Sequence, residues 1–120
     1  MGAASRRWWV TFVTPEAVAP TGRRQLEIGE DEFLWQAAGR AGLALPSRCR
    51  IGWCLSCAGR LLEPGKFDQS AARRYFAEDR AAGFILLCTA RPRSDLTITT
   101  HQAEAMRAHR IRLGLPATLG

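Results

Sequence analysis

Four cysteines carry the clearest chemical signal in this sequence. Cys49, Cys54 and Cys57 stand in the short stretch SRCRIGWCLSC, and Cys88 follows the third after thirty intervening residues. The first three thiols must share one tight loop, and the fourth must return to them from the end of the apolar run FILL at 84–87. Thiols grouped in this way can form disulfides, bind a metal ion or cluster, or act as redox-active nucleophiles.

The spacing of the cysteines separates these possibilities. C-x4-C-x2-C with a distant fourth cysteine is a ligand pattern of [2Fe–2S] clusters, whereas the C-x2-C-x2-C-x3-C-P run of [4Fe–4S] proteins is absent. A Rieske centre needs two histidines, and His101 and His109 stand near no cysteine pair. Structural zinc prefers paired C-x2-C knuckles, and a thioredoxin-like motif leaves Cys49 and Cys88 unexplained. The spacing therefore favours a [2Fe–2S] cluster, with zinc as the main alternative.

The residues around the cysteines suit a cluster whose inorganic sulfides are negatively charged. Gly52 and Gly59 allow the backbone to approach closely, so that N–H groups can donate hydrogen bonds to the sulfurs. Ser56 stands between two of the cysteines and can add a hydroxyl donor.

Length and composition set the class of protein. A chain of 120 residues predicts one domain with a hydrophobic core. No apolar run is long enough for a signal peptide or a membrane span, so we expect a cytoplasmic protein without membrane insertion. In a reducing cytosol, cysteines serve as metal ligands or reactive groups more often than as disulfides. The net charge of +6, with sixteen arginines and Lys66 as the single lysine, favours acidic proteins, nucleic acids or anionic surfaces as partners.

Hydrophobic periodicity changes along the chain from strand to helix and back. We predict an amphipathic helix over 30–42, where apolar residues recur every three to four positions. The predicted strands are 8–13, 23–28, a short strand that ends at the Pro–Gly turn 64–65, 84–88 and 95–100, with helical turns inside 68–83. The first two strands form a hairpin, and the whole order predicts a mixed α+β domain.

Several motifs resemble those of the plant-type [2Fe–2S] ferredoxins of chloroplasts and cyanobacteria. They are LPSRCRIGWCLSCAGRLLEPG, FDQS and GFILLCTARPRSDLTITTHQAE, together with the helix DEFLWQAAGRAGLALP that precedes the cysteine loop. The resemblance extends from about Trp8 to Glu104 and includes all four cysteines. It implies a β-grasp (ubiquitin-like) fold, with a mixed sheet and one main helix.

The resemblance also implies a site and a function. It implies a [2Fe–2S] cluster, with Cys49 and Cys54 on the outer iron and Cys57 and Cys88 on the inner iron. It implies one-electron transfer between protein partners and no catalysis. The donor would be a reductase or a photosystem-type protein in a bacterial or cyanobacterial cytosol, and we expect the carrier to be a monomer.

The chain runs past the usual end of that family. We expect a [2Fe–2S] domain at 1–105 and an extension at 106–120, made basic by Arg107, Arg110 and Arg112. From His101 onward the sequence suits a helix or a frayed tail. For 106–120 a solvated, flexible tail is the simplest interpretation, and a partner-specific arm is the alternative.

The cluster loop departs from the family pattern. Arg48 stands where the family commonly has a small hydroxyl residue, and Arg48 and Arg50 can stabilise the added electron and raise the reduction potential. The alternative is that both side chains point into solvent, where their charge is screened. Trp53 replaces a small residue and can shield the outer iron or contact a partner; alternatively, it packs on the loop as a partly exposed residue.

The predicted partner surface has changed sign relative to the family. Where photosynthetic relatives carry acidic residues after DQS, this chain has Arg73, Arg74, Tyr75 and Phe76, and an acidic pair near the C-terminus is reduced to Glu104. We expect these residues to contact redox partners that have acidic docking surfaces. We also expect poor coupling to the usual ferredoxin–NADP reductase, whose docking surface is basic.

An alternative function is an iron–sulfur regulatory or interaction module that binds an acidic partner or nucleic acid. The excess of arginine allows it. The basic residues are scattered along the chain, however, and no helix-turn-helix or RNA-binding motif accompanies them, which disfavours nucleic acid. The main hypothesis is an electron carrier that serves a specialised, acidic-surfaced oxidoreductase.

Overall fold

A β-hairpin opens the fold, as the alternating pattern predicted. The computed structural model describes residues 6–16, 18, 22–48 and 55–117. Strands β1 (Arg7–Thr14) and β2 (Gly22–Gly29) pair antiparallel along their whole length, with Val10 opposite Leu26 and Phe12 opposite Arg24. The first two strands of the chain thus pair with each other.

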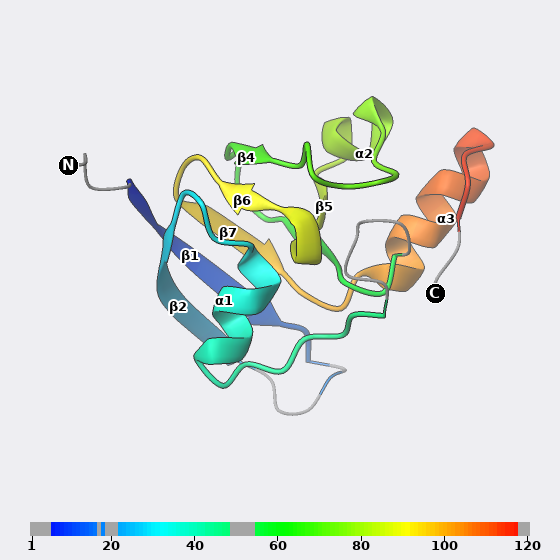
Figure 1. The fold of residues 1–120 in the computed structure, drawn as a ribbon. Helices are drawn as coiled ribbons and strands as arrows, with labels where there is room; N and C mark the ends of the chain where they lie inside the picture. The colour runs from blue at the N-terminus through cyan, green and yellow to red at the C-terminus, as the bar shows by residue number, and fades with distance from the viewer. Residues whose placement is uncertain (1–5, 17, 19–21, 49–54, 118–120) are drawn as a thin grey trace.

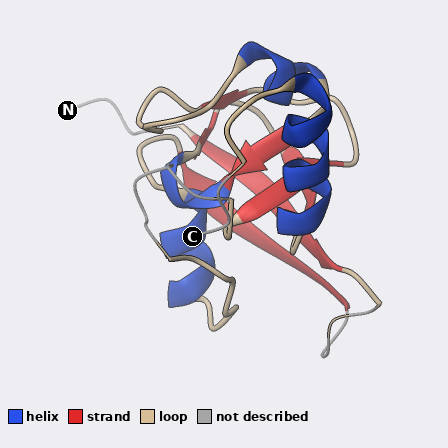
Figure 2. Ribbon diagram, turned by 90° about the vertical axis from the view of Figure 1, so that its right-hand side faces the viewer, coloured by secondary structure: helices blue, strands red, loops and turns tan. Residues whose placement is uncertain are grey.

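Three further strands extend the hairpin into a five-stranded mixed sheet. They are β3 (Ala58–Leu61), β5 (Phe84–Leu86) and β7 (Leu96–Thr99), and the sheet order is β2-β1-β7-β3-β5. β7 is parallel to β1, whereas β3 is antiparallel to both of its neighbours. Figure 1 shows the helices placed around this sheet, and Figure 2 shows the strands at the centre of the domain.

Alternation along the strands places one face of the sheet in the core. Val10 and Phe12 of β1 and Ile98 of β7 are buried together with Ile28 of β2. Residues between them in the sequence lie on the other face, because successive strand side chains alternate. Aromatic and β-branched side chains fill this layer, which explains why the segments with the strongest strand propensity form the central strands.

Helix α1 (Leu34–Arg40) packs its apolar stripe into this core, with Leu34, Ala37 and Ala38 buried. It is shorter than the predicted helix over 30–42. The acidic residues 30–32 lie before the helix, and the Glu32 carboxylate accepts the N–H of Gly29 at 2.8 Å. The Leu34 N–H donates to the Ala90 carbonyl at 2.9 Å, so the start of α1 is tied to the segment that follows Cys88.

Small elements surround the end of β5. They are the strands β4 (Phe67–Asp68) and β6 (Arg91–Pro92), which pair with each other, the helix α2 (Ala77–Ala81) and the 3-10 turn η1 (Leu87–Thr89). The sequence predicted one strand over 84–88, but the strand ends at Leu86 and Cys88 lies in η1. The two-residue strands were not predicted, because so short a segment has no measurable period.

The C-terminal helix α3 (Ala103–Leu113) is the longest helix in the described part of the chain. We expected a solvated tail from residue 106, but Met106 and Arg110 are fully buried. The guanidinium of Arg110 meets the buried carboxylate of Asp79 in α2, with Nη2 2.8 Å from Oδ2. Figure 1 accordingly shows α2 and α3 at the same end of the domain. Gly114, in the left-handed conformation at φ 71°, ends the helix.

The topology is the predicted β-grasp fold, a mixed sheet with few helices. No helix among the described residues is long and apolar enough to cross a membrane.

Candidate metal centre

Two of the four predicted ligands meet in the interior. The Sγ atoms of Cys57 and Cys88 lie 3.1 Å apart, and both residues are buried. A disulfide requires about 2.05 Å between its sulfurs, so the pair is not covalently joined. Thiolates that bind one tetrahedral metal at about 2.3 Å also stand within a few ångströms of each other. The geometry therefore suits two ligands of the same iron.

Strand pairing brings the two cysteines together. Cys57 precedes β3 and Cys88 follows β5, and the register sets Ala58 opposite Leu86. One residue beyond that pair, the N–H of Leu87 donates to the carbonyl of Cys57 at 3.3 Å. The thirty-residue separation in sequence is thus closed by an antiparallel ladder that ends at the site.

A buried glutamine supports the Cys88 segment. The Gln69 side chain hydrogen-bonds both backbone groups of Leu86 and the hydroxyl of Thr89. Sequence reasoning noted FDQS only as part of a resemblance and assigned Gln69 no role. A buried glutamine between a strand and a loop cannot be recognised from sequence alone, because its partners lie seventeen to twenty residues away.

Two serines flank the cluster loop. The Arg48 N–H donates to Ser56 Oγ at 3.0 Å. Ser47 Oγ is buried and has no hydrogen-bond partner among the described residues. A buried hydroxyl without an acceptor is destabilising by about 1–3 kcal/mol. Negatively charged cluster sulfurs would supply an acceptor for the Ser47 proton, so this residue fits an iron–sulfur cluster.

The remaining residues of the predicted cluster environment divide into two groups. The Arg48 side chain is exposed at the edge of the described part of the loop. Cys49, Arg50, Gly52, Trp53 and Cys54 lie outside the described residues.

The aromatic residues predicted as partner contacts are engaged inside the protein. The hydroxyl of Tyr75 donates to the Phe84 carbonyl at 2.5 Å, and burial raises the pKa of this phenol. The Phe76 ring lies under the Arg110 guanidinium, 4.9 Å from its carbon to the ring centroid. Both rings therefore pack between α2 and its neighbours and are only partly accessible.

The charged residues predicted as partner contacts are more accessible. Arg73 is exposed, Arg74 is half-buried and offers its carbonyl to Arg110, and Glu104 is exposed in the first turn of α3. The same bond to Arg110 places the Arg73–Arg74 segment beside α3. A surface that combines these two parts of the sequence is therefore available to another protein.

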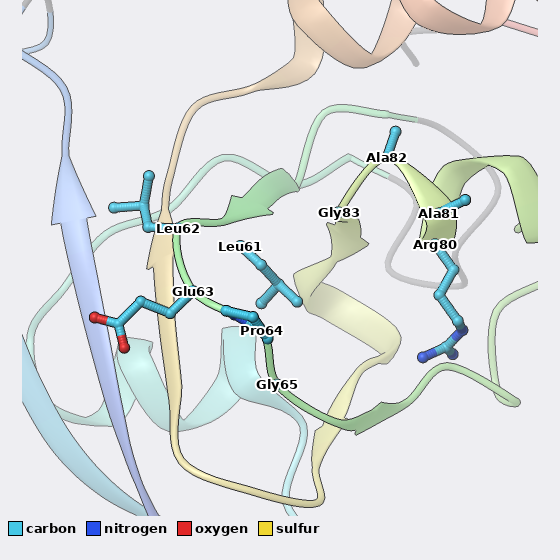
Figure 3. A pocket seen from close by; sticks show the side chains of 9 residues that line it. All are labelled: Leu61, Leu62, Glu63, Pro64, Gly65, Arg80, Ala81, Ala82 and Gly83. Carbon is cyan, nitrogen blue, oxygen red and sulfur yellow. The ribbon is translucent and has the colours of Figure 1, made fainter.

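A shallow hollow of about 410 Å³ lies between the β3–β4 connection and the end of α2 (Figure 3). Its walls are formed by Leu61, Leu62, Glu63, Pro64, Gly65, Arg80, Ala81, Ala82 and Gly83. None of these residues is a cysteine, so this hollow is separate from the thiol pair.

A β-grasp domain with two buried, closely spaced thiols and a four-cysteine C-x4-C-x2-C…C pattern defines an iron–sulfur protein of the [2Fe–2S] class. Comparison with known proteins agrees with this class. The family model of the 2Fe-2S iron-sulfur cluster binding domain matches residues 18–93. The heterocyst ferredoxin of Microchaete diplosiphon is 43% identical over 77 residues, which cover 64% of this chain and 77% of that protein.

Two solved structures of longer chains are similar to most of this chain. Pectocin M2 has a TM-score of 0.68 and 29% identity, covering 81% of this chain and 33% of that chain. The Amycolatopsis cytochrome P450 reductase GcoB has a TM-score of 0.63 and 27% identity, covering 78% of this chain and 26% of that chain.

The chain belongs to the plant-type [2Fe–2S] ferredoxin family. It carries a [2Fe–2S] cluster and is an electron carrier, not an enzyme. Helix α3 lies outside the part of the chain that the family model matches.

Proposed function

We propose that this ferredoxin transfers one electron at a time between protein partners through a [2Fe–2S] cluster held by Cys49, Cys54, Cys57 and Cys88. The observation that carries the assignment of ligands is the buried 3.1 Å approach of Cys57 and Cys88, which stand thirty-one positions apart. The cluster supplies one reversible electron at a potential on the order of −400 mV for this type. The chain holds the thiolates, excludes water on the inner side and presents a docking surface.

Optical spectroscopy of the anaerobically purified protein tests this proposal. We expect visible absorption that dithionite bleaches and that is lost when any one of the four cysteines is replaced by alanine. Leu62→Ala is a suitable control, because this side chain is 54% exposed on the connection between β3 and β4, outside the segments that carry the four cysteines. A colourless protein that contains zinc would overturn the proposal.

We further propose that the partners present acidic docking surfaces. The formal charge of the chain is +6, and an oxidised cluster with four thiolates contributes about −2, so about +4 remains. Arg73, Arg107 and Arg112 are exposed and have no ion-pair partner among the described residues, whereas buried Arg110 is neutralised by Asp79. These free cations around α2 and α3 favour a negatively charged surface.

Electron transfer from two flavoprotein reductases, one with an acidic and one with a basic docking face, tests the sign of the surface. We expect the acidic reductase to reduce the cluster at least about 10-fold faster at low salt, and the advantage to shrink as salt rises. Arg107→Glu should reduce that rate more than Arg23→Glu, which makes the same charge change on β2. Faster transfer from the basic reductase at ordinary salt would contradict the proposal.

We also propose that Arg48 raises the reduction potential, because its backbone is fixed to Ser56 beside Cys57. Replacement by serine, the small hydroxyl residue common in the family, should lower the midpoint potential in a redox titration. Arg23→Ser, at an exposed arginine on β2 that has no ion-pair partner among the described residues, is the control. An unchanged potential in Arg48→Ser would mean that the charge is screened by solvent.

A further inference from the structure

We propose that Gln69 is a positioning residue for the cluster. Its side chain holds Cys88 in place and orients the hydroxyl of Thr89. The proposal rests on the proposed function, because it takes Cys88 as a cluster ligand. Gln69 is 4% exposed and lies in the connection between β4 and α2, far in sequence from every cysteine.

The amide of Gln69 bridges the two sides of Cys88. Its Oε1 accepts the N–H of Leu86 at 3.0 Å, and its Nε2 donates to the Leu86 carbonyl at 2.9 Å. The same Nε2 donates to Thr89 Oγ1 at 2.9 Å. The Gln69 side chain therefore binds Leu86, two positions before Cys88, and Thr89, directly after Cys88. The strand β5 ends at Leu86, so Cys88 and Thr89 lie beyond it.

The hydrogen-bond pattern fixes the direction of this amide. A backbone N–H can only donate, so the amide oxygen must face Leu86 N, and the amide nitrogen must face the two acceptors. Thr89 Oγ1 is therefore an acceptor in this contact, and its own proton points elsewhere. Because Thr89 is 3% exposed and adjoins Cys88, its hydroxyl lies in the buried region next to the ligand. A hydroxyl donor there stabilises the more negative, reduced cluster.

Gln69 is itself held in place by the contacts of its own backbone and of the preceding residue, Asp68. Asp68 pairs with Arg91 in the β4–β6 ladder, and Asp68 Oδ2 lies 3.2 Å from Arg93 Nη2. The Gln69 carbonyl accepts the N–H of Ala72 at 3.0 Å. Since β6 begins only three residues after Cys88, the β4–β6 pairing holds Gln69 next to the Cys88 segment.

Replacing Gln69 should therefore change the cluster more than the fold. Outer-shell partners of metal ligands typically account for about 10-fold to 100-fold in metal affinity. We expect the cluster of Gln69→Ala to be lost to a chelator about 10-fold faster than that of the wild type. A tenfold difference in stabilisation between the two oxidation states would shift the midpoint potential by about 59 mV.

The experiment compares Gln69→Ala and Gln69→Glu in the full-length holoprotein. Glutamate has the same shape and keeps an acceptor for Leu86 N–H, but when ionised it donates to neither the Leu86 carbonyl nor Thr89. Gln25→Ala and Gln25→Glu are the matched controls, because the Gln25 amide also donates to a threonine hydroxyl, Thr11, at 3.3 Å, on the exposed hairpin. Cluster lifetime, midpoint potential and the electron paramagnetic resonance spectrum of the reduced state are measured for each.

We expect both Gln69 variants to shorten the cluster lifetime, shift the potential and alter the spectrum, while the Gln25 variants match the wild type. Unchanged values in folded Gln69→Glu holoprotein would overturn the proposal. If both Gln69 variants were unfolded by circular dichroism, the residue would serve general packing, which would also overturn it. A wild-type protein without a [2Fe–2S] spectrum would instead contradict the proposed function itself.

Discussion

Two buried polar side chains hold this domain together in contrasting ways. Gln69 is neutral and satisfies three hydrogen bonds with the segment that carries Cys88. Arg110 is charged and joins α3 to α2 through two bonds to Asp79, with further bonds to the carbonyls of Arg74 and Pro116. Gln69 lies inside the region matched by the family model, whereas Arg110 lies beyond it.

The contrast separates two roles: Gln69 acts on the cluster, and Arg110 attaches the C-terminal helix α3. In its proposed role, the neutral amide of Gln69 positions Cys88 without placing a fixed charge beside the cluster. A buried ion pair carries a large desolvation penalty, which it offsets only while both partners are present. We therefore expect changes at Arg110 to act mainly on stability, and changes at Gln69 to act mainly on the cluster.

Removal of the Arg110 guanidinium should have the largest effect on stability. Arg110→Ala leaves the carboxylate of Asp79, which is 0% exposed, without its cation. His109 Nε2 is 3.4 Å from Asp79 Oδ1 but forms no hydrogen bond with the carboxylate. Loss of one partner of a buried pair costs about 3–5 kcal/mol in the free energy of unfolding, which urea denaturation measures.

Arg112→Ala is the control for Arg110→Ala, since Arg112 is an exposed arginine on the same helix. Surface substitutions of this kind change stability by about 0.5 kcal/mol or less. Equal losses in the two variants would mean that the ion pair does not anchor α3.

Truncation of Gln69 should have a smaller effect on stability and a larger effect on the cluster. Gln69→Ala leaves the buried N–H of Leu86 without its acceptor, which costs about 1–3 kcal/mol. Arg110→Ala holoprotein, measured at low temperature where it stays folded, should keep the wild-type midpoint potential. A shift in potential from Arg110→Ala as large as that from Gln69→Ala would erase the distinction between the two regions.

Replacement of both charges should cost less than removal of one. In Asp79→Leu/Arg110→Met neither charge remains to be desolvated, and substitution of buried ion pairs by apolar residues is often neutral or stabilising. The Arg74 and Pro116 carbonyls still lose a donor, and the Phe76 N–H loses Asp79 as its acceptor at 2.9 Å. We therefore expect a net loss that is below that of Arg110→Ala in urea denaturation. A loss equal to that of the single variant would show that these hydrogen bonds to the backbone outweigh the ion pair.

The smallest expected effect on stability is that of His101, which lies in the connection between β7 and α3. Its φ of 59° is left-handed, and burial lowers the pKa of its imidazole below the ordinary 6.5. The unfolded chain then binds the proton more readily than the folded protein, so the free energy of unfolding should fall as pH decreases below 6.5.

His101→Asn tests this pH dependence, because asparagine tolerates a left-handed backbone and does not titrate. The variant should lose less stability than the wild type between neutral pH and pH values below 6.5 in urea denaturation. Parallel curves for the two proteins would mean that His101 makes no contribution in this range.

The sequence predicted the main strands, the first helix, the fold class and the family. These predictions succeeded where the signal is local: alternation in β1 and β2, a helical stripe in α1, and cysteine spacing. They failed where a long-range partner decides the outcome. Met106 and Arg110 belong to a helix because α2 and the core cover them, and nothing near residue 110 in sequence indicates Asp79.

By itself, then, the sequence determined a mixed α+β domain with the ligand spacing of a [2Fe–2S] cluster, because spacing and strand periodicity are read from consecutive residues. Its resemblance to the plant-type ferredoxins implied the β-grasp fold and the carrier function, in agreement with the family model. Only the tertiary structure decided how Cys57 and Cys88 are brought together. The β3–β5 register brings Cys57 to Cys88, and Gln69 closes over the Cys88 segment from a distant part of the chain. Such contacts depend on three-dimensional packing of buried polar groups, and packing of that kind leaves no periodic trace in a sequence.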